Sequence, residues 1–305
     1  MATPVSSLPL ATDSTPTVGS ILNQYRIEEL LGEGATGVVL RAYDLRLRRQ
    51  VALKLLRRDL QADRVAWGRM LREARAISRL NHPGFCAIYE VAEDQGRVYI
   101  AMEYVPGRSL RRLVAGKGLP KEQLLLYGAQ LAAALAHAHE RGLIHRDIKS
   151  SNVIIKPNGV VKLVDLGLAL RIRQKQLEKY ASSASFQEGG EAGGTLPYLA
   201  PEILRGERAS VQSDIWALGT LLYEMAAGKL PFTGRTCFEA SLAIMTQPPP
   251  PLPREIGWRL ATVIQRCLQK ECARRYATVG EVRGDIETIL LASRRGPSIV
   301  LRTID

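Results

Sequence analysis

Apolar and polar positions alternate with a period of two residues over much of the first third of the chain, which is typical of β-strands. Residues 50–56 alternate around Lys54 and predict a strand with one face on a core. Four similar runs, over residues 25–31, 38–43, 88–93 and 97–103, predict further strands. Residues 64–80 instead place apolar side chains at steps of three and four, which predicts a helix. Together these runs predict a small unit of about five strands and one helix.

Beyond residue 105 the pattern changes to the period of an α-helix. Residues 121–141 carry one apolar stripe, and residues 214–228 are so apolar that we expect this helix to run through a core. Shorter patterns predict helices over 256–270 and 279–293 and strands over 153–155 and 160–163. Residues 168–199 show no sustained period and hold a glycine cluster, which predicts a long exposed segment. The expected fold class is α+β, with a small antiparallel sheet and one main helix followed by a larger, mostly helical part.

Composition marks the boundaries between these parts. Residues 1–20 are rich in Pro, Ser and Thr and lack a hydrophobic period, which predicts a disordered leader. The turn Val105-Pro106-Gly107 separates a small lobe over 21–104 from a large lobe over 105–293, and residues 294–305 form a tail.

The chain is strongly basic, with a formal net charge of +12 over 305 residues. A nucleic-acid site would combine basic residues with interleaved aromatics, but aromatics make up only 6% of the chain and the arginines are scattered. We therefore expect a solvated or substrate-steering surface and no specific nucleic-acid partner.

Targeting and redox signals favour the cytoplasm. No apolar run reaches the roughly 20 residues that cross a bilayer, and the first basic residue is Arg26, so the charged start of a signal peptide is missing. The four cysteines form no C-x-x-C pair, which disfavours a zinc site or a disulfide framework. We expect a chain without a membrane segment in a reducing, cytoplasmic environment.

The residues with the clearest chemistry lie in the run from 145 to 152. Asp147 can orient a hydroxyl and accept its proton, and Lys149 can neutralise the charge of a phosphoryl group. Asn152 and the downstream Asp165 offer the oxygen ligands that Mg²⁺ prefers. A lone His-Arg-Asp triplet would mean little, but the full run followed by a second carboxylate is specific for phosphoryl transfer.

Glycines at positions 32, 34 and 37 give a weaker signal between two predicted strands. A backbone without side chains can approach phosphate oxygens and offer them N–H donors. A tight hairpin that merely collects glycines remains the alternative. A Rossmann fingerprint is discounted, because that motif opens a helix whereas this one returns as a strand.

A lysine and a glutamate give a second weak signal. Lys54 lies among apolar neighbours on its predicted strand, and Glu73 lies in the middle of the following predicted helix. A lysine that faces a core is costly unless it is paired. A Lys54–Glu73 ion pair would hold the ammonium ready for the α- and β-phosphates of a nucleotide. The alternative is two solvated surface charges.

Six motifs occur in a fixed order along the chain. They are GEGATGVV (32–39), VALK (51–54), HRDIKSSN (145–152), DLG (165–167), GTLPYLAPE (194–202) and DIWALG (214–219). This set resembles the eukaryotic-type Ser/Thr protein kinases, closest to their bacterial members, over residues 25–290. The resemblance implies a bilobal protein kinase fold, ATP with Mg²⁺ (or Mn²⁺), protein substrates, and an activation segment over 165–202.

The resemblance also implies roles for individual residues. The catalytic set would be Asp147 as base, Lys149, the activating pair Lys54–Glu73, and Thr195 as a contact of the loop that holds Asp147, with Asn152 and Asp165 as metal ligands. Val39, Ala52 and Ile154 would sandwich the adenine, Met102 would be the gatekeeper, and Glu103–Val105 the hinge. The rest of the implied ATP-binding set is Leu31, Gly32, Glu33, Gly34, Ala35, Thr36, Gly37, Val38 and Lys54. Glu202 should pair with Arg275, and Asp214 should brace the loop from the central helix.

Three residues depart from the family pattern. Leu166 replaces the usual Phe of the DFG motif but stays apolar, and Cys272 stands where Pro is common. Ser150 replaces the usual Pro after Lys149, which we expect to cost some rigidity without removing a functional group. None of the three removes a charge that phosphoryl transfer needs.

Regulation and activity leave alternatives open. Arg146 precedes Asp147 as in kinases whose activation segment is ordered by phosphorylation, and Ser182, Ser183 and Ser185 are the candidate acceptors. These serines could instead merely fill an exposed loop. A homodimer could support autophosphorylation in trans. The rival to an active kinase is a pseudokinase-type scaffold that binds nucleotide without turnover.

Overall fold

The computed structural model describes residues 16–34, 37–57, 68, 74, 75, 78, 80–94, 96–164 and 195–294. Several predicted segments lie wholly or mostly outside these residues. They are the leader up to residue 15, most of the helix expected over 64–80, the segment from 165 to 194, and the tail from 295.

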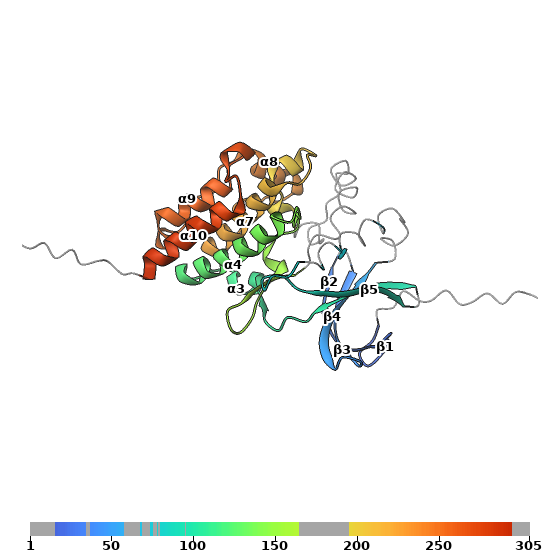
Figure 1. Cartoon of the computed structure of the whole chain (residues 1–305). Coiled ribbons are helices and arrows are strands. Elements are labelled where there is room, and N and C mark those ends of the chain that lie inside the picture. Colours follow the sequence, from blue (N-terminus) through green and yellow to red (C-terminus); the bar gives the residue numbers. More distant parts are fainter. Residues whose placement is uncertain are drawn as a thin grey trace, which may run out of the picture.

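Six strands form one antiparallel sheet, which lies at the lower right of Figure 1. Their bounds are β1 (Ile21–Leu22), β2 (Tyr25–Gly34), β3 (Gly37–Asp44), β4 (Arg49–Leu56), β5 (Ile88–Asp94) and β6 (Arg97–Glu103). The order across the sheet is β1-β2-β3-β4-β6-β5. The five predicted strands are confirmed. However, β2 continues to Gly34, so the glycines belong to the end of a β-hairpin, and β1 is too short to show a period.

Alternation along β4 sorts its side chains onto the two faces of the sheet. Val51 and Leu53 lie in one apolar cluster, and Ala52 lies in a second cluster that includes Met102. Lys54 has the parity of Ala52 and is only 7% exposed. The sheet therefore presents its lysine on the same face as the second apolar cluster.

The rest of the described chain is mainly helical. A small second sheet is formed by β7 (Arg108–Ser109), β8 (Val153–Ile155) and β9 (Val161–Leu163). The α-helices are α3 (Leu110–Val114), α4 (Lys121–His139), α6 (Pro201–Leu204), α7 (Val211–Ala227), α8 (Cys237–Thr246), α9 (Trp258–Cys267) and α10 (Val279–Arg294). Short 3₁₀ turns are η1 (Ser150–Asn152), η3 (Leu196–Tyr198), η4 (Arg254–Ile256) and η5 (Cys272–Arg274). Within the described ranges, no helix is both long and apolar enough to cross a membrane.

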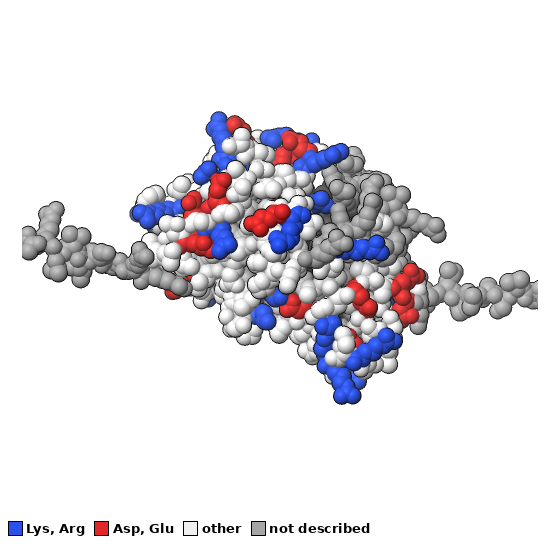
Figure 2. All heavy atoms as spheres, in the orientation of Figure 1, with Lys and Arg blue, Asp and Glu red and all other residues white. Residues whose placement is uncertain are grey.

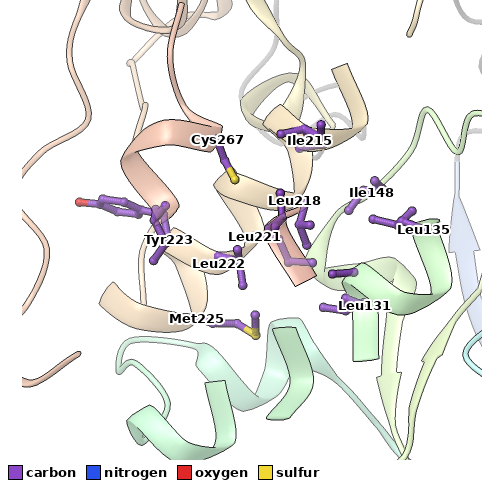
Figure 3. Close-up of a cluster of buried hydrophobic side chains, with 14 of the residues drawn as sticks. Leu131, Leu135, Ile148, Ile215, Leu218, Leu221, Leu222, Tyr223, Met225 and Cys267 are labelled. Carbon is purple, nitrogen blue, oxygen red and sulfur yellow. The ribbon is translucent and has the colours of Figure 1, made fainter. Parts of the chain in front are cut away.

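Helix α7 is the centre of the helical part, as its apolar sequence predicted. Its residues from Ser213 to Ala226 are buried, and it packs against α4 and α9. Figure 3 shows its leucines among side chains of both neighbouring helices. The helix begins at Val211 rather than at the predicted Asp214, because the Ser213 hydroxyl accepts the backbone N–H of Ser210 at 2.8 Å and caps the first turn. It ends before Gly228, whose φ of 69° suits a glycine.

The sheet and the helices occupy opposite ends of the molecule (Figure 1). The segment that joins them follows β6 directly and leads through β7 into α3. This is the α+β, two-lobed fold that the sequence predicted, and the fold class is confirmed.

Candidate active site

The run from residue 145 to residue 152, called loop 145–152 below, is fastened to the central helix. The Asp214 carboxylate accepts the backbone N–H groups of His145 at 2.7 Å and Arg146 at 2.9 Å. Its Oδ2 also lies 2.8 Å from Nε2 of His139, in the last turn of α4. Arg146 has a φ of 69°, a left-handed conformation that costs a non-glycine residue about 1–3 kcal/mol. The predicted bracing of the loop by Asp214 is confirmed.

Three side chains converge on the Asp147 carboxylate. Lys149 Nζ lies 2.9 Å from Oδ2, and the Asn152 amide nitrogen donates to Oδ2 and to the Asp147 carbonyl, both at 2.9 Å. Thr195 Oγ1 accepts from Lys149 Nζ at 2.9 Å and lies 3.5 Å from the other carboxylate oxygen, Oδ1. The sequence separated Thr195 from this loop by more than forty residues, yet the fold brings it to the predicted position beside the carboxylate.

The end of β9 lies against the same loop. The backbone N–H of Val164 donates to the Asn152 carbonyl at 2.9 Å, and β8 pairs with β9 through Val153 and Leu163. Asp165 follows Val164 directly in the chain but lies outside the described residues. Because the Asn152 amide nitrogen is used by Asp147, its amide oxygen is the end that remains suited to a cation.

The residues implied in adenine binding form one apolar cluster. Ala52, Met102 and Val105 are buried members, and Val39 and Ile154 pack against them. The cluster joins the large sheet to β8 of the small one. It can supply the apolar surface that a flat aromatic ring requires.

Glu103 has contacts that the sequence did not indicate. Its backbone N–H already donates to the Ala87 carbonyl at 2.8 Å, and its carbonyl accepts from the Cys86 thiol at 3.2 Å. Its carboxylate forms an ion pair of 2.7 Å with Lys162 on β9. A carbonyl oxygen has two lone pairs, so the Glu103 carbonyl can still accept a second hydrogen bond.

Two glycines of the first motif differ in what the fold requires. Gly37 has a φ of 142°, and a Cβ there would lie 1.8 Å from the Leu55 carbonyl, so the close approach of β3 to β4 demands glycine. A Cβ on Gly32 would meet nothing within 4 Å. The hairpin therefore explains Gly37, while Gly32 leaves open space that a phosphate could approach.

The remaining described members of the implied ATP-binding set lie outside the apolar cluster implied in adenine binding. Val38 packs against the cluster on the opposite face of the sheet from Val39. Leu31 and Glu33 are exposed on β2. Ala35, Thr36, Glu73, Asp165, Ser182, Ser183 and Ser185 lie outside the described residues, so the Lys54–Glu73 pair and the candidate phosphorylation sites stay predictions.

The predicted ion pair of Glu202 and Arg275 is confirmed. Two guanidinium nitrogens of Arg275 donate hydrogen bonds to the two carboxylate oxygens of Glu202, at 2.7 and 2.8 Å. The pair is buried, and Arg275 also donates to the backbone carbonyls of Gln212 and Gln269. Burial alone would raise the pKa of Glu202, but the hydrogen bonds and charge of Arg275 outweigh it and hold this pKa below its ordinary value.

Ser150 has hydrogen-bond partners that the sequence did not reveal. It is 2% exposed, and its hydroxyl lies 2.9 Å from both the Tyr198 hydroxyl and Glu224 Oε1. Tyr198 also donates to Glu224 Oε2. Serine at this position therefore makes hydrogen bonds that Pro could not, while the expected cost in rigidity stays a prediction. The available signal was Glu224, an acidic residue within the apolar second half of α7.

The fold has two lobes, and a loop anchored to its central helix carries Asp147, Lys149 and Asn152 side by side. This combination defines the protein kinase class. Residues 25–283 match the family described as the protein kinase domain. The chain belongs to the protein kinase family, as the motifs predicted.

Curated relatives extend the comparison. The chain is 36% identical over 290 residues to serine/threonine-protein kinase PknA of Mycobacterium tuberculosis, a match that covers 93% of this chain and 65% of that protein. It is 34% identical over 279 residues to serine/threonine-protein kinase PrkC of Bacillus subtilis, covering 90% of this chain and 42% of that protein. The chain thus spans between 41% and 65% of the length of such relatives.

A solved structure confirms the fold independently. The kinase domain of Mycobacterium tuberculosis PknI, crystallised as a double mutant, superposes with a TM-score of 0.69. The match covers 90% of this chain and 99% of that one at 24% identity. At this identity the likeness concerns the fold alone.

Proposed function

We propose that this chain is a serine/threonine protein kinase that transfers the γ-phosphate of ATP to hydroxyl groups of proteins. The observation that carries the proposal is the Asp147 carboxylate, held between Lys149 and Asn152 with the Thr195 hydroxyl beside it. A carboxylate next to an ammonium suits the deprotonation of an attacking hydroxyl beside a charged phosphoryl group. The names of the curated relatives, serine/threonine-protein kinases, support the choice of acceptor.

In this proposal each group has one task. Asp147 orients the acceptor hydroxyl and takes its proton, and Lys149 balances negative charge on the phosphoryl group. Lys54, paired with Glu73, holds the α- and β-phosphates. Asn152 and Asp165 would hold Mg²⁺, with Mn²⁺ as an alternative, because both offer hard oxygen ligands. When bound, the metal neutralises charge on the phosphates of the nucleotide.

The nucleotide itself would lie between the two lobes of the fold. Val39, Ala52 and Ile154 supply apolar surface for the adenine, and the backbone from Glu103 to Val105 supplies its hydrogen bonds. The open space at Gly32 supports an approach of phosphate oxygens to that backbone.

The decisive experiment compares wild type with Asp147→Asn in labelled ATP, Mg²⁺ and a protein acceptor. Asparagine keeps the shape of the side chain but cannot take a proton, so we expect transfer to fall by about 10²- to 10⁴-fold. Affinity for ATP, measured by calorimetry, should stay within a few-fold. Equal transfer by both proteins would refute the assignment of Asp147.

The same proteins separate the two remaining questions. Binding of ATP by wild type with no transfer to any acceptor would favour the pseudokinase-type scaffold. Label incorporated into Asp147→Asn by the wild type would demonstrate autophosphorylation in trans, for which Ser182, Ser183 and Ser185 are the proposed sites and Arg146 the proposed partner of the phosphate.

A further inference from the structure

Three buried side chains from three different elements form a closed ring of contacts. Ser150 comes from η1 in loop 145–152, Tyr198 from η3, and Glu224 from α7. The Ser150 hydroxyl lies 2.9 Å from the Tyr198 hydroxyl and 2.9 Å from Glu224 Oε1, and Tyr198 contacts Glu224 Oε2. The backbone N–H of Ser150 points to the Tyr198 hydroxyl at 3.4 Å. All three side chains are at most 8% exposed.

Glu224 accepts hydrogen bonds from both of its partners in the ring. The Ser150 and Tyr198 hydroxyls each carry one hydrogen, and each directs it to a different oxygen of the carboxylate. Burial, the largest influence, raises the pKa of Glu224, and the hydrogen bonds from Tyr198 and Ser150 and the charge of Arg111 oppose this rise.

The ring is connected to the reacting groups through a short stretch of backbone. Tyr198 N–H donates to the Thr195 carbonyl at 3.0 Å, and Thr195 contacts both Lys149 and Asp147. Residues 195–198 are thus held at one end by the ring and touch the carboxylate at the other. Thr195 lies beside Oδ1, whereas Lys149 and Asn152 contact Oδ2, so we expect an acceptor hydroxyl to bind Asp147 at the oxygen next to Thr195.

We propose that Ser150 is a positioning residue for the acceptor side of phosphoryl transfer. Its hydroxyl fixes residues 195–198 against loop 145–152 and acts through Tyr198 and Thr195 on Asp147 and Lys149. This role rests on the proposed kinase function. The apolar cluster implied in adenine binding shares no residue with the ring, so we expect adenine binding to be unaffected by the loss of the Ser150 hydroxyl.

The test compares steady-state kinetics of wild type and Ser150→Ala with ATP and a protein acceptor varied in turn. We expect kcat/KM for the acceptor to fall by about tenfold, as for the loss of one well-placed hydrogen bond, while KM for ATP stays within twofold. Thr278→Ala is the matched control. It removes a hydroxyl that accepts the backbone N–H of Glu281 at 3.3 Å, on α10, and should lower stability without changing either kinetic constant.

Two further variants examine the ring itself. Tyr198→Phe should reproduce the effect of Ser150→Ala, and the double variant should be little worse than either single one, because both remove the same unit. Glu224→Gln keeps the shape of the side chain but leaves only one acceptor oxygen for the two hydroxyls, so it should lower kcat/KM for the acceptor about as much as Ser150→Ala does.

Three outcomes would overturn the proposal. They are unchanged acceptor kinetics in Ser150→Ala, an equal loss in Thr278→Ala, or additive losses in the Ser150 and Tyr198 variants. Unchanged acceptor kinetics in Glu224→Gln would contradict the role of the carboxylate in the ring. Failure of the kinase function itself is distinguishable, because the wild type would then transfer no label.

Discussion

Lys270 is a half-buried amine in an unusual setting. Its Nζ donates to the Ile244 carbonyl at 2.6 Å and lies 3.9 Å from the centre of the Phe232 ring. Burial, followed by the charge of Arg275, lowers the pKa of Lys270 from 10.5 to about 8. The charged form is thus less favourable in the folded protein than in the unfolded chain.

A pH dependence of stability follows from this shift. Between pH 8 and pH 10.5 the unfolded chain retains the proton of Lys270 and the folded protein loses it, so the contribution of this residue to the free energy of unfolding rises with pH. Solvent around the half-exposed amine reduces the effect. Urea unfolding at pH 7.5 and pH 10 should show this rise as a difference between wild type and Lys270→Met. Cys267, whose pKa burial raises to about 12, acts in the opposite direction but is common to both proteins. Identical pH dependence in the two would contradict the prediction.

Spacing along the chain was sufficient to find Asp147, Lys149 and Asn152, because all three lie within six residues of one another. It could not reveal the role of Ser150, whose partners lie 48 and 74 residues away. Local pattern identifies groups that act together on one loop. A hydrogen bond between distant segments depends on the tertiary fold, which no local period encodes.

At the level of elements, length decided what the sequence could predict. The long helices α4, α7 and α10 showed their periods clearly, whereas β1, β7 and α3 have two to five residues and showed none. The predicted start of α7 was wrong for a reason other than the length of the element. The first turn of α7 is polar, and only the cap formed by Ser210 and Ser213 indicates where the helix begins.

Packing between helices gives a prediction at this scale. A Cβ on Gly219 of α7 would lie 2.5 Å from the Cβ of Cys267 on α9, which is close to the backbone and cannot move away. A Cβ on Gly128 of α4 would lie 2.8 Å from Leu222 Cδ2, the end of a flexible side chain. Alanine in a helix gains about 1 kcal/mol over glycine, but overpacking costs about 1–3 kcal/mol.

Because the Cβ of Cys267 cannot move away, we expect overpacking at Gly219 to cost about 2–3 kcal/mol, so that Gly219→Ala lowers the free energy of unfolding by about 1–2 kcal/mol. Gly128→Ala should stay within about 1 kcal/mol of wild type. Urea denaturation of the two variants in parallel measures this difference. A Gly219→Ala protein as stable as wild type would show that α7 and α9 can separate at little cost.

For the whole molecule, the distribution of charge matters more than its sum. Figure 2 shows Lys and Arg interspersed with Asp and Glu on the visible face rather than gathered in one stripe. The net charge of +12 should still attract polyanions in a way that depends on counterion release.

We expect weak binding to duplex DNA of any sequence at about 50 mM salt, lost by about 200 mM. Fluorescence anisotropy with two unrelated duplexes at both salt concentrations measures this. Binding that survived the higher salt or distinguished the two duplexes would indicate a dedicated nucleic-acid site instead.

Asp214 has a consequence for how such a protein can be controlled. Its carboxylate belongs to the most buried helix and yet holds two backbone N–H groups of loop 145–152. This buried carboxylate therefore holds the left-handed backbone at Arg146 from within the core. A signal that released the loop would leave the buried carboxylate without these two partners, at a cost of about 1–3 kcal/mol or more. We therefore expect control to leave this loop assembled and to act on the delivery of the nucleotide, the metal or the acceptor to it.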